Sequence, residues 1–465
     1  MSSAIETRAP EASVTRDAPS VTWASSFAKD APAMRAPFPG PRSLELYQRC
    51  RNREFRAFPW VRQVPVAFES GAGVTLQDVD GNRYIDLTHG HMGAALGHAN
   101  PEVADAVDHQ LRTLSHLRNQ PTEVRAELQD RLARLTPGDL NLFAFYSSGT
   151  EAAEGAMRVA RAVTGGHEFI SFYGDYHGRT SSAMGTSFGG SRMTGPRPGG
   201  YVTLPNGYCH RCEFKLTPSS CGIYCLDYAE RAIKMNSHGA LAGIIAEPIT
   251  NASGARVFPT GYLRRLREIA DRFGALLIFD EHATGLGRTG AMWAGDHEGV
   301  IPDVIYFGKY LGNGYPITVV ATREDYRAKL EPERQGSTHG GQPLACAAAL
   351  AVVRILERDD LTGHARRTGE PCLRQMKGVA ARSSIVSDAR GRGLQLAYEL
   401  ADPKTGLPST EIADKVYAAC VERGVLTSPV GPNLRISPMM VTSESAALKA
   451  FELVAAAIEH VENRL

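Results

Sequence analysis

LLIFDEHATGLGRTG, residues 276–290, starts as a short apolar run and becomes polar abruptly at two carboxylates, Asp280 and Glu281. A short apolar run bounded by turn residues predicts a buried strand. The carboxyl ends of strands in an open α/β sheet are where such sheets bind ligands, although an aspartate at a strand end is also common as a turn or cap residue. We therefore expect a central strand that ends at a ligand site.

The sequence on both sides of this stretch alternates short apolar runs with segments of helical period. Such alternation predicts an α/β domain with a mostly parallel central sheet. The predicted strands are residues 140–147, 167–173, 241–248, 274–281, 303–309 and 317–322, and the predicted helices are 151–163 and 262–274. Upstream, the runs on either side of Asp80-Gly81 predict a hairpin, and residues 102–117 predict a helix.

A chain of 465 residues is too long for one small domain. Residues 1–40 are rich in Ala, Pro, Ser and Thr, so we expect a flexible tail there. We expect residues 41–100 to form the N-terminal part of a small domain and residues 101–345 a large domain. Helical and alternating segments mix over residues 346–465, which predicts the C-terminal part of a smaller α/β domain.

Charge and composition exclude some classes of partner. The 51 basic and 50 acidic side chains nearly cancel, so the formal net charge of +1 gives no general attraction to nucleic acid or an anionic membrane. No stretch approaches the roughly 20 apolar residues of a membrane helix, and the N-terminus lacks the apolar core of a secretory signal. We expect a cytoplasmic protein with no nucleic-acid or membrane partner.

The segment Tyr146–Glu151 ends an apolar run and begins a predicted helix. Its Ser148, Gly149 and Thr150 offer backbone N–H groups, hydroxyl donors and the positive end of the helix dipole. That combination seats phosphate groups well, although a plain Ser or Thr cap looks the same in sequence.

Lys309 closes the apolar run VIYF and is followed by the glycine-rich GKYLGNGYP, residues 308–316. It is the only lysine between Lys234 and Lys329. Lysines are normally solvated, and one drawn into a pocket has a lowered pKa and can form a Schiff base with a carbonyl compound. A solvated surface lysine is the alternative.

The run Gly285–Gly290 matches GxGxxG, the pattern of dinucleotide-binding loops. A true fingerprint needs a helix directly after the glycines and an acidic residue about 20 positions later. AMWAGDHEGVIPD follows here, with two more glycines and a proline, so we reject a dinucleotide site.

From about residue 40 to 465 the chain resembles the class III (ω-amino acid:pyruvate type) aminotransferases of pyridoxal-5'-phosphate (PLP) fold type I. The two stretches quoted above carry most of the resemblance. It is reinforced by SGTEAAEGAMRVAR (148–161), YHGRT (176–180) and STHGGQPLACAAALAV (337–352), which occur in the family's order. The resemblance implies a large domain with a mostly parallel sheet and a smaller α/β domain.

The resemblance also implies which residues bind PLP. Lys309 is expected to carry the cofactor as a Schiff base and to move protons during the reaction. Asp280 is expected to contact the pyridine nitrogen and keep it protonated, so that the ring stays an electron sink. Gly149 and Thr150, with Ser148 nearby, are expected to hold the phosphate.

Further site residues follow from the same resemblance. Tyr176 matches the aromatic residue that stacks on the cofactor ring, and His177 follows it in the same cofactor-binding motif. Glu247 matches a glutamate near the cofactor, and Arg435 matches an arginine that grips a substrate carboxylate, which bidentate geometry suits. Thr338 matches a residue that family members lend to the phosphate of the neighbouring subunit, so the resemblance implies a homodimer with shared active sites.

The chain departs from the family at two places. The family's DEVQTG reads DEHATG here, so His282 replaces a valine on the cofactor face and Ala283 replaces a glutamine that bonds the ring hydroxyl. An imidazole there can stack on the ring, shuttle a proton, contact the substrate, or be a tolerated exchange. The family's EPIQGEGG reads EPITNASG, which removes a glutamate that neutralises the substrate arginine and argues against 4-aminobutyrate or ornithine as the preferred amine.

We predict a PLP-dependent aminotransferase that moves an amino group from an amino acid or amine to a keto or aldehyde acceptor, in a specialised biosynthetic pathway. A PLP-dependent racemase, epimerase or decarboxylase on the same fold is the alternative, and His282 keeps it open because an extra acid–base group can redirect a proton. A non-catalytic binding module is disfavoured because Lys309 and Asp280 are retained.

Four of the eight cysteines form CHRC-x8-CGIYC, namely Cys209, Cys212, Cys221 and Cys225. Such spacing is compatible with a zinc site. We favour reduced thiols in a loop, because the chemistry of this fold needs no metal, and we expect no metal at the active site.

Overall fold

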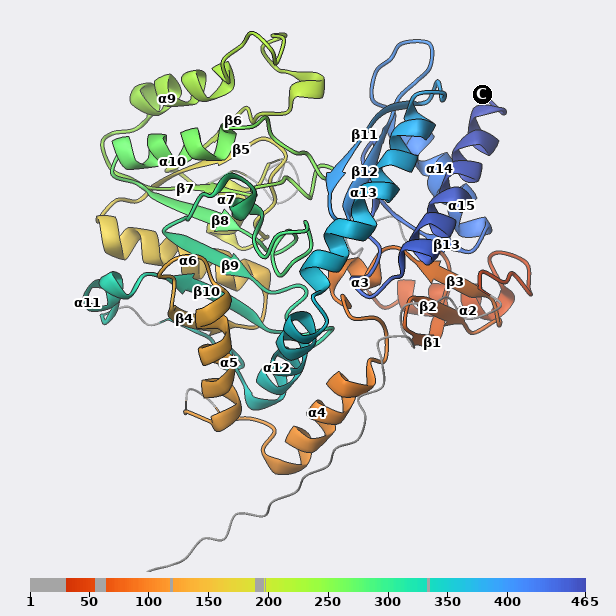
Figure 1. The fold of residues 1–465 in the computed structure, drawn as a ribbon, viewed down its shortest axis with the longest axis horizontal. Coiled ribbons are helices and arrows are strands. Elements are labelled where there is room, and N and C mark those ends of the chain that lie inside the picture. Colours follow the sequence, from red (N-terminus) through yellow and green to blue (C-terminus); the bar gives the residue numbers. More distant parts are fainter. Residues whose placement is uncertain (1–30, 55–63, 118–119, 189–195, 197, 333–334) are drawn as a thin grey trace, which may run out of the picture.

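The computed structural model describes residues 31–54, 64–117, 120–188, 196, 198–332 and 335–465. Most of the predicted N-terminal tail therefore lies outside the described residues. Figure 1 shows a larger α/β body beside a smaller one, with the C-terminus in the smaller. Within the described part of the chain, no helix is long and apolar enough to cross a membrane.

The larger body is built on a seven-stranded sheet with strand order β4-β10-β9-β8-β7-β5-β6. Neighbours from β9 to β6 pair in parallel and β10 pairs antiparallel on both sides, so the predicted mostly parallel sheet is confirmed. Its strands are β4 (Leu142–Tyr146), β5 (Glu168–Phe172), β6 (Tyr201–Leu204), β7 (Leu241–Ala246), β8 (Leu276–Asp280), β9 (Val304–Phe307) and β10 (Thr318–Thr322).

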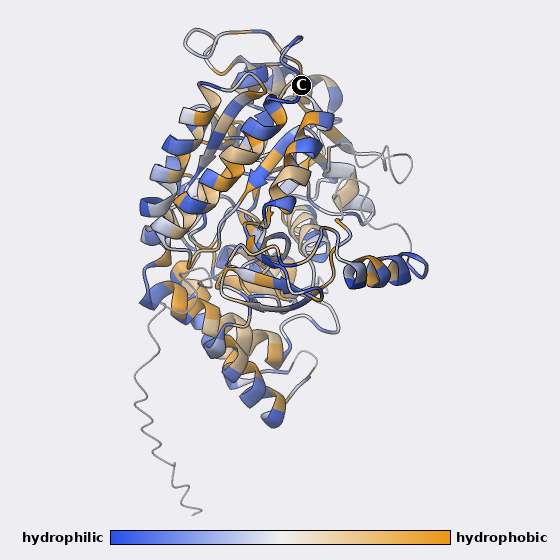
Figure 2. Ribbon diagram, turned by 90° about the vertical axis from the view of Figure 1, so that its right-hand side faces the viewer, coloured by the Kyte–Doolittle hydropathy of each residue, from blue (hydrophilic) through white to orange (hydrophobic). Residues whose placement is uncertain are grey.

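Helices pack on this sheet and on one another with their apolar sides. Figure 2, in which the smaller body faces the viewer, shows hydrophobic and hydrophilic residues alternating along the helices as in amphipathic helices. The helices are α4 (Pro101–Thr113), α5 (Glu123–Leu135), α6 (Gly149–Thr164), α7 (Ser181–Thr186), α9 (Tyr224–Asn236), α10 (Tyr262–Arg272), α11 (Arg327–Leu330) and α12 (Pro343–Arg358). The sequence prediction for residues 102–117 is confirmed as α4, which ends four residues earlier.

Small side chains bring α6 close to the sheet. Its buried face is mostly alanine and glycine, and a β-carbon at Gly155 would lie 2.5 Å from the Tyr146 hydroxyl. The close approach sets the N-terminus of α6 beside the carboxyl ends of the central strands, where ligands bind in such sheets.

The smaller body contains two four-stranded sheets. One has the order β1-β2-β3-β13, and the other has the order β11-β12-β15-β14. The strands are β1 (Phe68–Ala72), β2 (Thr75–Asp78), β3 (Arg83–Asp86), β11 (Val386–Arg392), β12 (Gln395–Leu400), β13 (Val425–Leu426), β14 (Ser428–Val430) and β15 (Asn433–Ile436). The helices are α2 (Pro41–Arg51), α3 (His89–Met92), α13 (Leu361–Ala380), α14 (Thr410–Glu422) and α15 (Glu444–Glu462).

The first of these sheets combines strands from the N-terminal and C-terminal parts of the chain. β2 and β3 form the predicted antiparallel hairpin, and β13 pairs in parallel with β3. The region after residue 358 was predicted only as a mixture, and it contains the long helix α13, which carries Pro371 inside it.

Candidate active site

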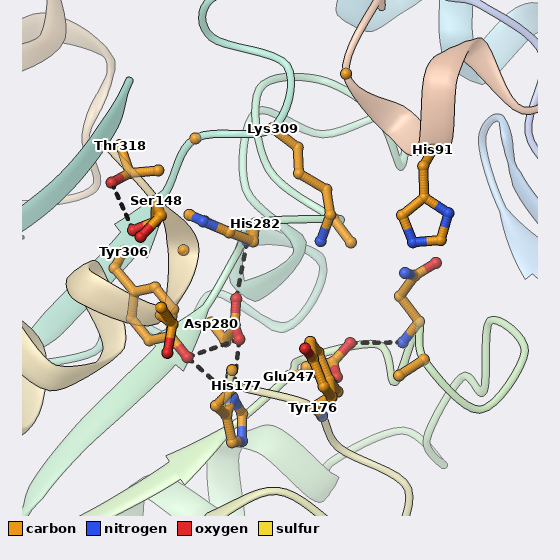
Figure 3. Close-up of a pocket in the computed structure, with 18 of the residues that line it drawn as sticks. His91, Ser148, Tyr176, His177, Glu247, Asp280, His282, Tyr306, Lys309 and Thr318 are labelled. Atoms are coloured by element: carbon orange, nitrogen blue, oxygen red, sulfur yellow. Dashed lines mark hydrogen bonds and ion pairs between the residues drawn. The ribbon is translucent and has the colours of Figure 1, made fainter. Parts of the chain in front are cut away.

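A cavity of about 590 Å³ lies at the carboxyl ends of β7, β8 and β9. Figure 3 shows the side chains of Lys309, Asp280, Glu247 and His282 converging on it. Its volume falls within the range of small-molecule sites. The strand ends predicted from sequence to meet a ligand therefore do surround a cavity.

Asp280 ends β8 and lies at the floor of this cavity. Its Oδ2 accepts hydrogen bonds from Nδ1 of His177 at 2.8 Å and from the Tyr306 hydroxyl at 2.6 Å, and its Oδ1 accepts from the backbone N–H of His282 at 3.0 Å. Burial raises the pKa of Asp280, but the hydrogen bonds and charge of His177 outweigh burial and hold the pKa below its usual value. Asp280 is therefore a fixed anion at the cavity floor.

His177 is fully buried between two carboxylates. Burial lowers its pKa, but hydrogen bonding and charge from Asp280, together with the charge of Asp175, raise the pKa above its ordinary value. Nε2 of His177 lies 3.9 Å from Asp175 Oδ2. The His177 imidazole thus stabilises the ionised form of Asp280.

Glu247 at the end of β7 is held by backbone groups. Its Oε1 accepts from the N–H of Tyr176 at 2.8 Å and its Oε2 from the N–H of Asn251 at 2.7 Å. Burial, followed by the charges of Asp175 and Asp280, raises the pKa of Glu247. The same burial raises the pKa of Asp175. The raised pKa values favour the protonated forms of these two carboxyls, which limits the negative charge near Asp280.

Lys309 follows β9 and is half-buried in the cavity wall. Burial lowers the pKa of its amine, while Asp280 and Glu247 act in the opposite direction. A lowered pKa makes an unprotonated amine available as a nucleophile and a proton acceptor. This geometry matches what a lysine that reacts with a carbonyl group needs.

The N-terminus of α6 closes one end of the cavity. Ser148 is its N-cap, and the first turn leaves the N–H groups of Gly149 and Thr150 without intrahelical acceptors. The two hydroxyls already donate elsewhere: Ser148 Oγ donates to Glu151, and Thr150 Oγ1 donates to Thr180 Oγ1 at 2.8 Å, because the Thr180 hydroxyl itself donates to a glutamate of α6. An anion here is therefore met mainly by backbone N–H groups and the helix dipole.

Arg435 on β15 lines the cavity from the smaller body. Its Nη2 donates to Ser428 Oγ at 2.8 Å, whereas its Nε is buried and has no hydrogen-bond partner in the described part of the chain. Burial lowers its pKa to about 10, so it stays a cation at neutral pH. His91 lines the same cavity, and burial lowers its pKa to about 4, with the charges of Arg435 and Lys309 adding to the shift.

These residues fit PLP. Backbone N–H groups at α6 suit its phosphate, the Asp280 carboxylate suits a protonated pyridine nitrogen, and the Lys309 amine suits its aldehyde. Gly149 also lacks the β-carbon that would fill the phosphate end of the cavity. The residues therefore match the cofactor at three of its polar groups, the phosphate, the ring nitrogen and the aldehyde.

The cavity brings together nearly all the site residues predicted from sequence. Its lining includes Ser148, Gly149, Thr150, Tyr176, His177, Glu247, Asp280, His282, Lys309 and Arg435. Thr338 is the exception, because it is exposed and does not line this cavity. The sequence reasoning missed Asp175, His91 and Tyr306.

Three of the four clustered cysteines lie in the segment between β6 and α9 and Cys225 lies in the first turn of α9, away from this cavity. All four are free thiols that line one small pocket of about 20 Å³. In the described ranges, no three His, Cys, Asp or Glu side chains are arranged to hold a metal ion.

Residues 57–458 match the family model described as aminotransferase class-III. The chain is 37% identical over 339 residues to an acetylornithine aminotransferase of Methanopyrus kandleri, covering 73% of this chain and 82% of the relative. It is 34% identical over 378 residues to the 5-aminovalerate aminotransferase DavT of Pseudomonas aeruginosa, covering 79% and 86%. These relatives are aminotransferases, and they give no support to the racemase or decarboxylase alternative.

Solved structures agree with this similarity. An (S)-enantioselective ω-transaminase from Thermomicrobium roseum has a TM-score of 0.84 at 28% identity, over 90% of this chain and 98% of the other. The ornithine aminotransferase from Toxoplasma gondii, solved with PLP partially occupying its active site, has a TM-score of 0.80 at 27% identity, over 91% and 95%.

Proposed function

The chain belongs to the class-III aminotransferase family and is a PLP-dependent aminotransferase, and on this premise we propose that both of its substrates carry a carboxylate bound by Arg435. The donor is then an amino acid and the acceptor an oxo acid. A simple amine that lacks a carboxylate is the competing donor class.

Arg435 is the observation that carries this proposal. It is buried, has an unpartnered Nε, and forms no ion pair with a carboxylate in the described part of the chain. Glu247 is fixed by two backbone N–H groups, and its raised pKa keeps it largely protonated. A buried, unpaired cation is costly, so a substrate carboxylate that pairs with Arg435 gains much more here than at a solvated site.

The names of the relatives agree with an amino acid donor. Acetylornithine and 5-aminovalerate are both amino acids, and each name describes the relative that bears it. We extend to this chain only what these donors share, a carboxylate on the same molecule as the amine.

The residues of the cavity divide the chemistry of the reaction among them. When bound, PLP supplies an electron-withdrawing ring that stabilises negative charge developing on the substrate carbon. Asp280, kept ionised by His177 and Tyr306, holds the proton on the ring nitrogen. Burial lowers the pKa of Lys309, so its amine would accept the proton from the substrate carbon. The same amine would then return the proton to the carbon that must gain one for the amino group to be transferred. Arg435 holds the carboxylate and orients the bond that loses the proton.

Matched pairs of donors test the substrate proposal. 5-Aminovalerate and butylamine differ only in the carboxylate, and so do ornithine and putrescine. With PLP-loaded protein and no acceptor, we expect the spectrum to convert to the amine form of the cofactor faster with the member that keeps the carboxylate. Equal rates within both pairs would contradict the proposal.

The variant Arg435→Gln tests the residue itself. A charge-assisted hydrogen bond contributes about 1.5–3 kcal/mol, so we expect the KM for the amino acid to rise about 10- to 100-fold, with little effect on the matched amine. Arg354→Gln on the exposed side of α12 is the control and should change neither donor.

We also propose a homodimer in which Thr338 reaches the phosphate site of the partner. Near the end of α4, Leu111 is 56% exposed, and Leu114 and Leu117 are exposed as well. The rings of His116 and His339 lie 4.9 Å apart, so this apolar surface adjoins the loop that carries Thr338. This surface is apolar and lies next to Thr338, which does not line the cavity of its own subunit. Both features suit contact with a second copy of the chain.

Light scattering on the purified protein tests the dimer. Leu111→Asp should give a monomer with weakened PLP binding, while Thr338→Ala should weaken PLP binding and leave the dimer intact. A monomeric wild-type protein would contradict the proposal.

We further propose a cytoplasmic location, which fractionation of the source cells tests.

A further inference from the structure

The imidazole of His282 lies along the cavity from its floor toward the N-terminus of α6. At one end the backbone N–H of His282 donates to Asp280. Figure 3 shows the ring pointing from there toward Ser148. A β-carbon on Gly149 would lie only 2.4 Å from Nε2 of His282, so this nitrogen is beside the first residue of the helix.

We propose that His282 donates a hydrogen bond from Nε2 to the phosphate of the bound cofactor. This inference rests on the placement of PLP given above. It assigns to His282 a role in anchoring the phosphate. This role is separate from any packing of the imidazole against the cofactor ring.

The tautomer of the imidazole follows from its surroundings. Burial lowers the pKa of His282 to about 4, with Asp280 opposing, so the ring is neutral at physiological pH. A neutral imidazole carries one N–H, on either Nδ1 or Nε2. Nδ1 is buried and has no hydrogen-bond partner in the described part of the chain, whereas Nε2 faces the phosphate seat. A phosphate acceptor beside Nε2 therefore favours the proton on Nε2.

The other groups around the phosphate site leave one direction of contact for such a donor. The hydroxyls of Ser148 and Thr150 are engaged in the cap of α6 and in the 179–180 turn. The backbone N–H groups of the first turn approach the phosphate from the helix side only. His282 comes from the end of β8, so its N–H approaches from a second direction and restricts the position of the phosphate.

A comparison of two ligands separates a phosphate bond from ring packing. PLP and pyridoxal share the ring and the aldehyde and differ only in the phosphate. His282→Val removes the donor and keeps an apolar side chain on the ring, while His282→Gln keeps an N–H donor. The affinity of each apo protein for both ligands is measured by fluorescence titration.

We expect His282→Val to weaken PLP binding at least about tenfold and to leave pyridoxal binding within about twofold, as the loss of one charge-assisted hydrogen bond predicts. His282→Gln should retain most of the PLP affinity. Equal losses for PLP and pyridoxal in His282→Val would assign His282 to packing alone, and no loss for either would exclude the role. Both results overturn the proposal.

A second measurement uses the wild-type protein, so it does not depend on how the variants fold. With ¹⁵N-labelled histidine and bound PLP, we expect one imidazole nitrogen to show scalar coupling to the ³¹P of the cofactor. If no histidine nitrogen couples to phosphorus, the proposed bond is absent. Neither experiment includes an amino donor, so failure of the substrate proposal leaves this one untouched.

Discussion

Replacing Tyr306 by phenylalanine should destabilise the protein by removing one hydrogen bond to a buried anion. The Tyr306 hydroxyl donates to Asp280 Oδ2 at 2.6 Å, and the side chain is 1% exposed. A hydrogen bond to a charged group contributes about 1.5–3 kcal/mol, and without Tyr306 the Oδ2 atom of Asp280 keeps only the hydrogen bond from His177. We therefore expect the free energy of unfolding to fall by about 1.5–3 kcal/mol.

Tyr262→Phe is the matched control. Tyr262 is equally buried in the same body, but its hydroxyl has no hydrogen-bond partner in the part of the chain that the structure describes. Removing that hydroxyl should cost nothing or stabilise the protein slightly, because a buried unsatisfied donor disappears. The comparison therefore isolates the bond to Asp280 from the general effect of removing a tyrosine hydroxyl.

Urea unfolding of PLP-loaded proteins, followed by circular dichroism, measures the difference. All proteins are compared at one concentration and one PLP concentration, because dimerisation and ligand binding both raise apparent stability. The slope of the transition should be the same in each protein, so that the midpoints report stability. If Tyr306→Phe and Tyr262→Phe lose the same free energy, the hydrogen bond does not stabilise Asp280 as argued.

Three further predictions test the electrostatics, the packing and the contact between the two bodies. Burial raises the pKa of Glu281 to about 8, so the folded protein holds a proton that the unfolded chain releases. The free energy of unfolding should therefore fall by up to about 1.4 kcal/mol per pH unit between about pH 5 and 8. Urea unfolding across that range should show that Glu281→Gln lacks this pH dependence. Gly149→Ala should weaken PLP binding at least about tenfold in a fluorescence titration, because the added methyl group overlaps the His282 imidazole. Adding His282→Ala in the same chain should cost little more, because the two substitutions remove the same contact and are not additive. The Tyr208 hydroxyl donates to the buried Glu399 of β12 and accepts from Arg390 at 2.8 Å. Tyr208→Phe should therefore lower the free energy of unfolding by about 1–3 kcal/mol. An unchanged urea midpoint would refute this expectation.

The sequence predicted those site residues whose signal is local. Asp280 and Lys309 each end an apolar run, and Gly149 begins a helix, so a few neighbouring residues were enough to mark them. Tyr306 gave no such signal, since it reads as one more apolar residue of a buried strand. Only the parallel register of β8 and β9, which pairs Asp280 with Tyr306, brings its hydroxyl to the carboxylate.

His91 was missed for a different reason. It belongs to α3, where His89, Gly90, His91 and Met92 all have positive φ. Left-handed backbone is rare for residues other than glycine, and a run of it follows no periodic pattern. The position of His91 in the cavity therefore depends on a backbone path that periodicity does not describe. The role of Thr338 stays a prediction, because it concerns a second copy of the chain.

The charges of the cavity are arranged so that each polar group of the ligands meets its opposite. In the proposed arrangement, the N–H groups of α6 and of His282 face the phosphate of the cofactor, and Asp280 faces its ring nitrogen. At the substrate end, Arg435 faces the cavity as a cation with no carboxylate partner in the described residues. The phosphate and the ring nitrogen arrive with the cofactor and stay, but the partner of Arg435 arrives only with a substrate.

This difference explains why substrate class is decided at Arg435. An oxo acid or amino acid pairs with the guanidinium in every half-reaction, so the buried charge is compensated each time. A simple amine leaves the charge unpaired, and the transition state then lacks an interaction that the amino acid provides. The cost falls on the reaction rate of the amine rather than on cofactor binding, because PLP makes its own contacts at the other end of the cavity.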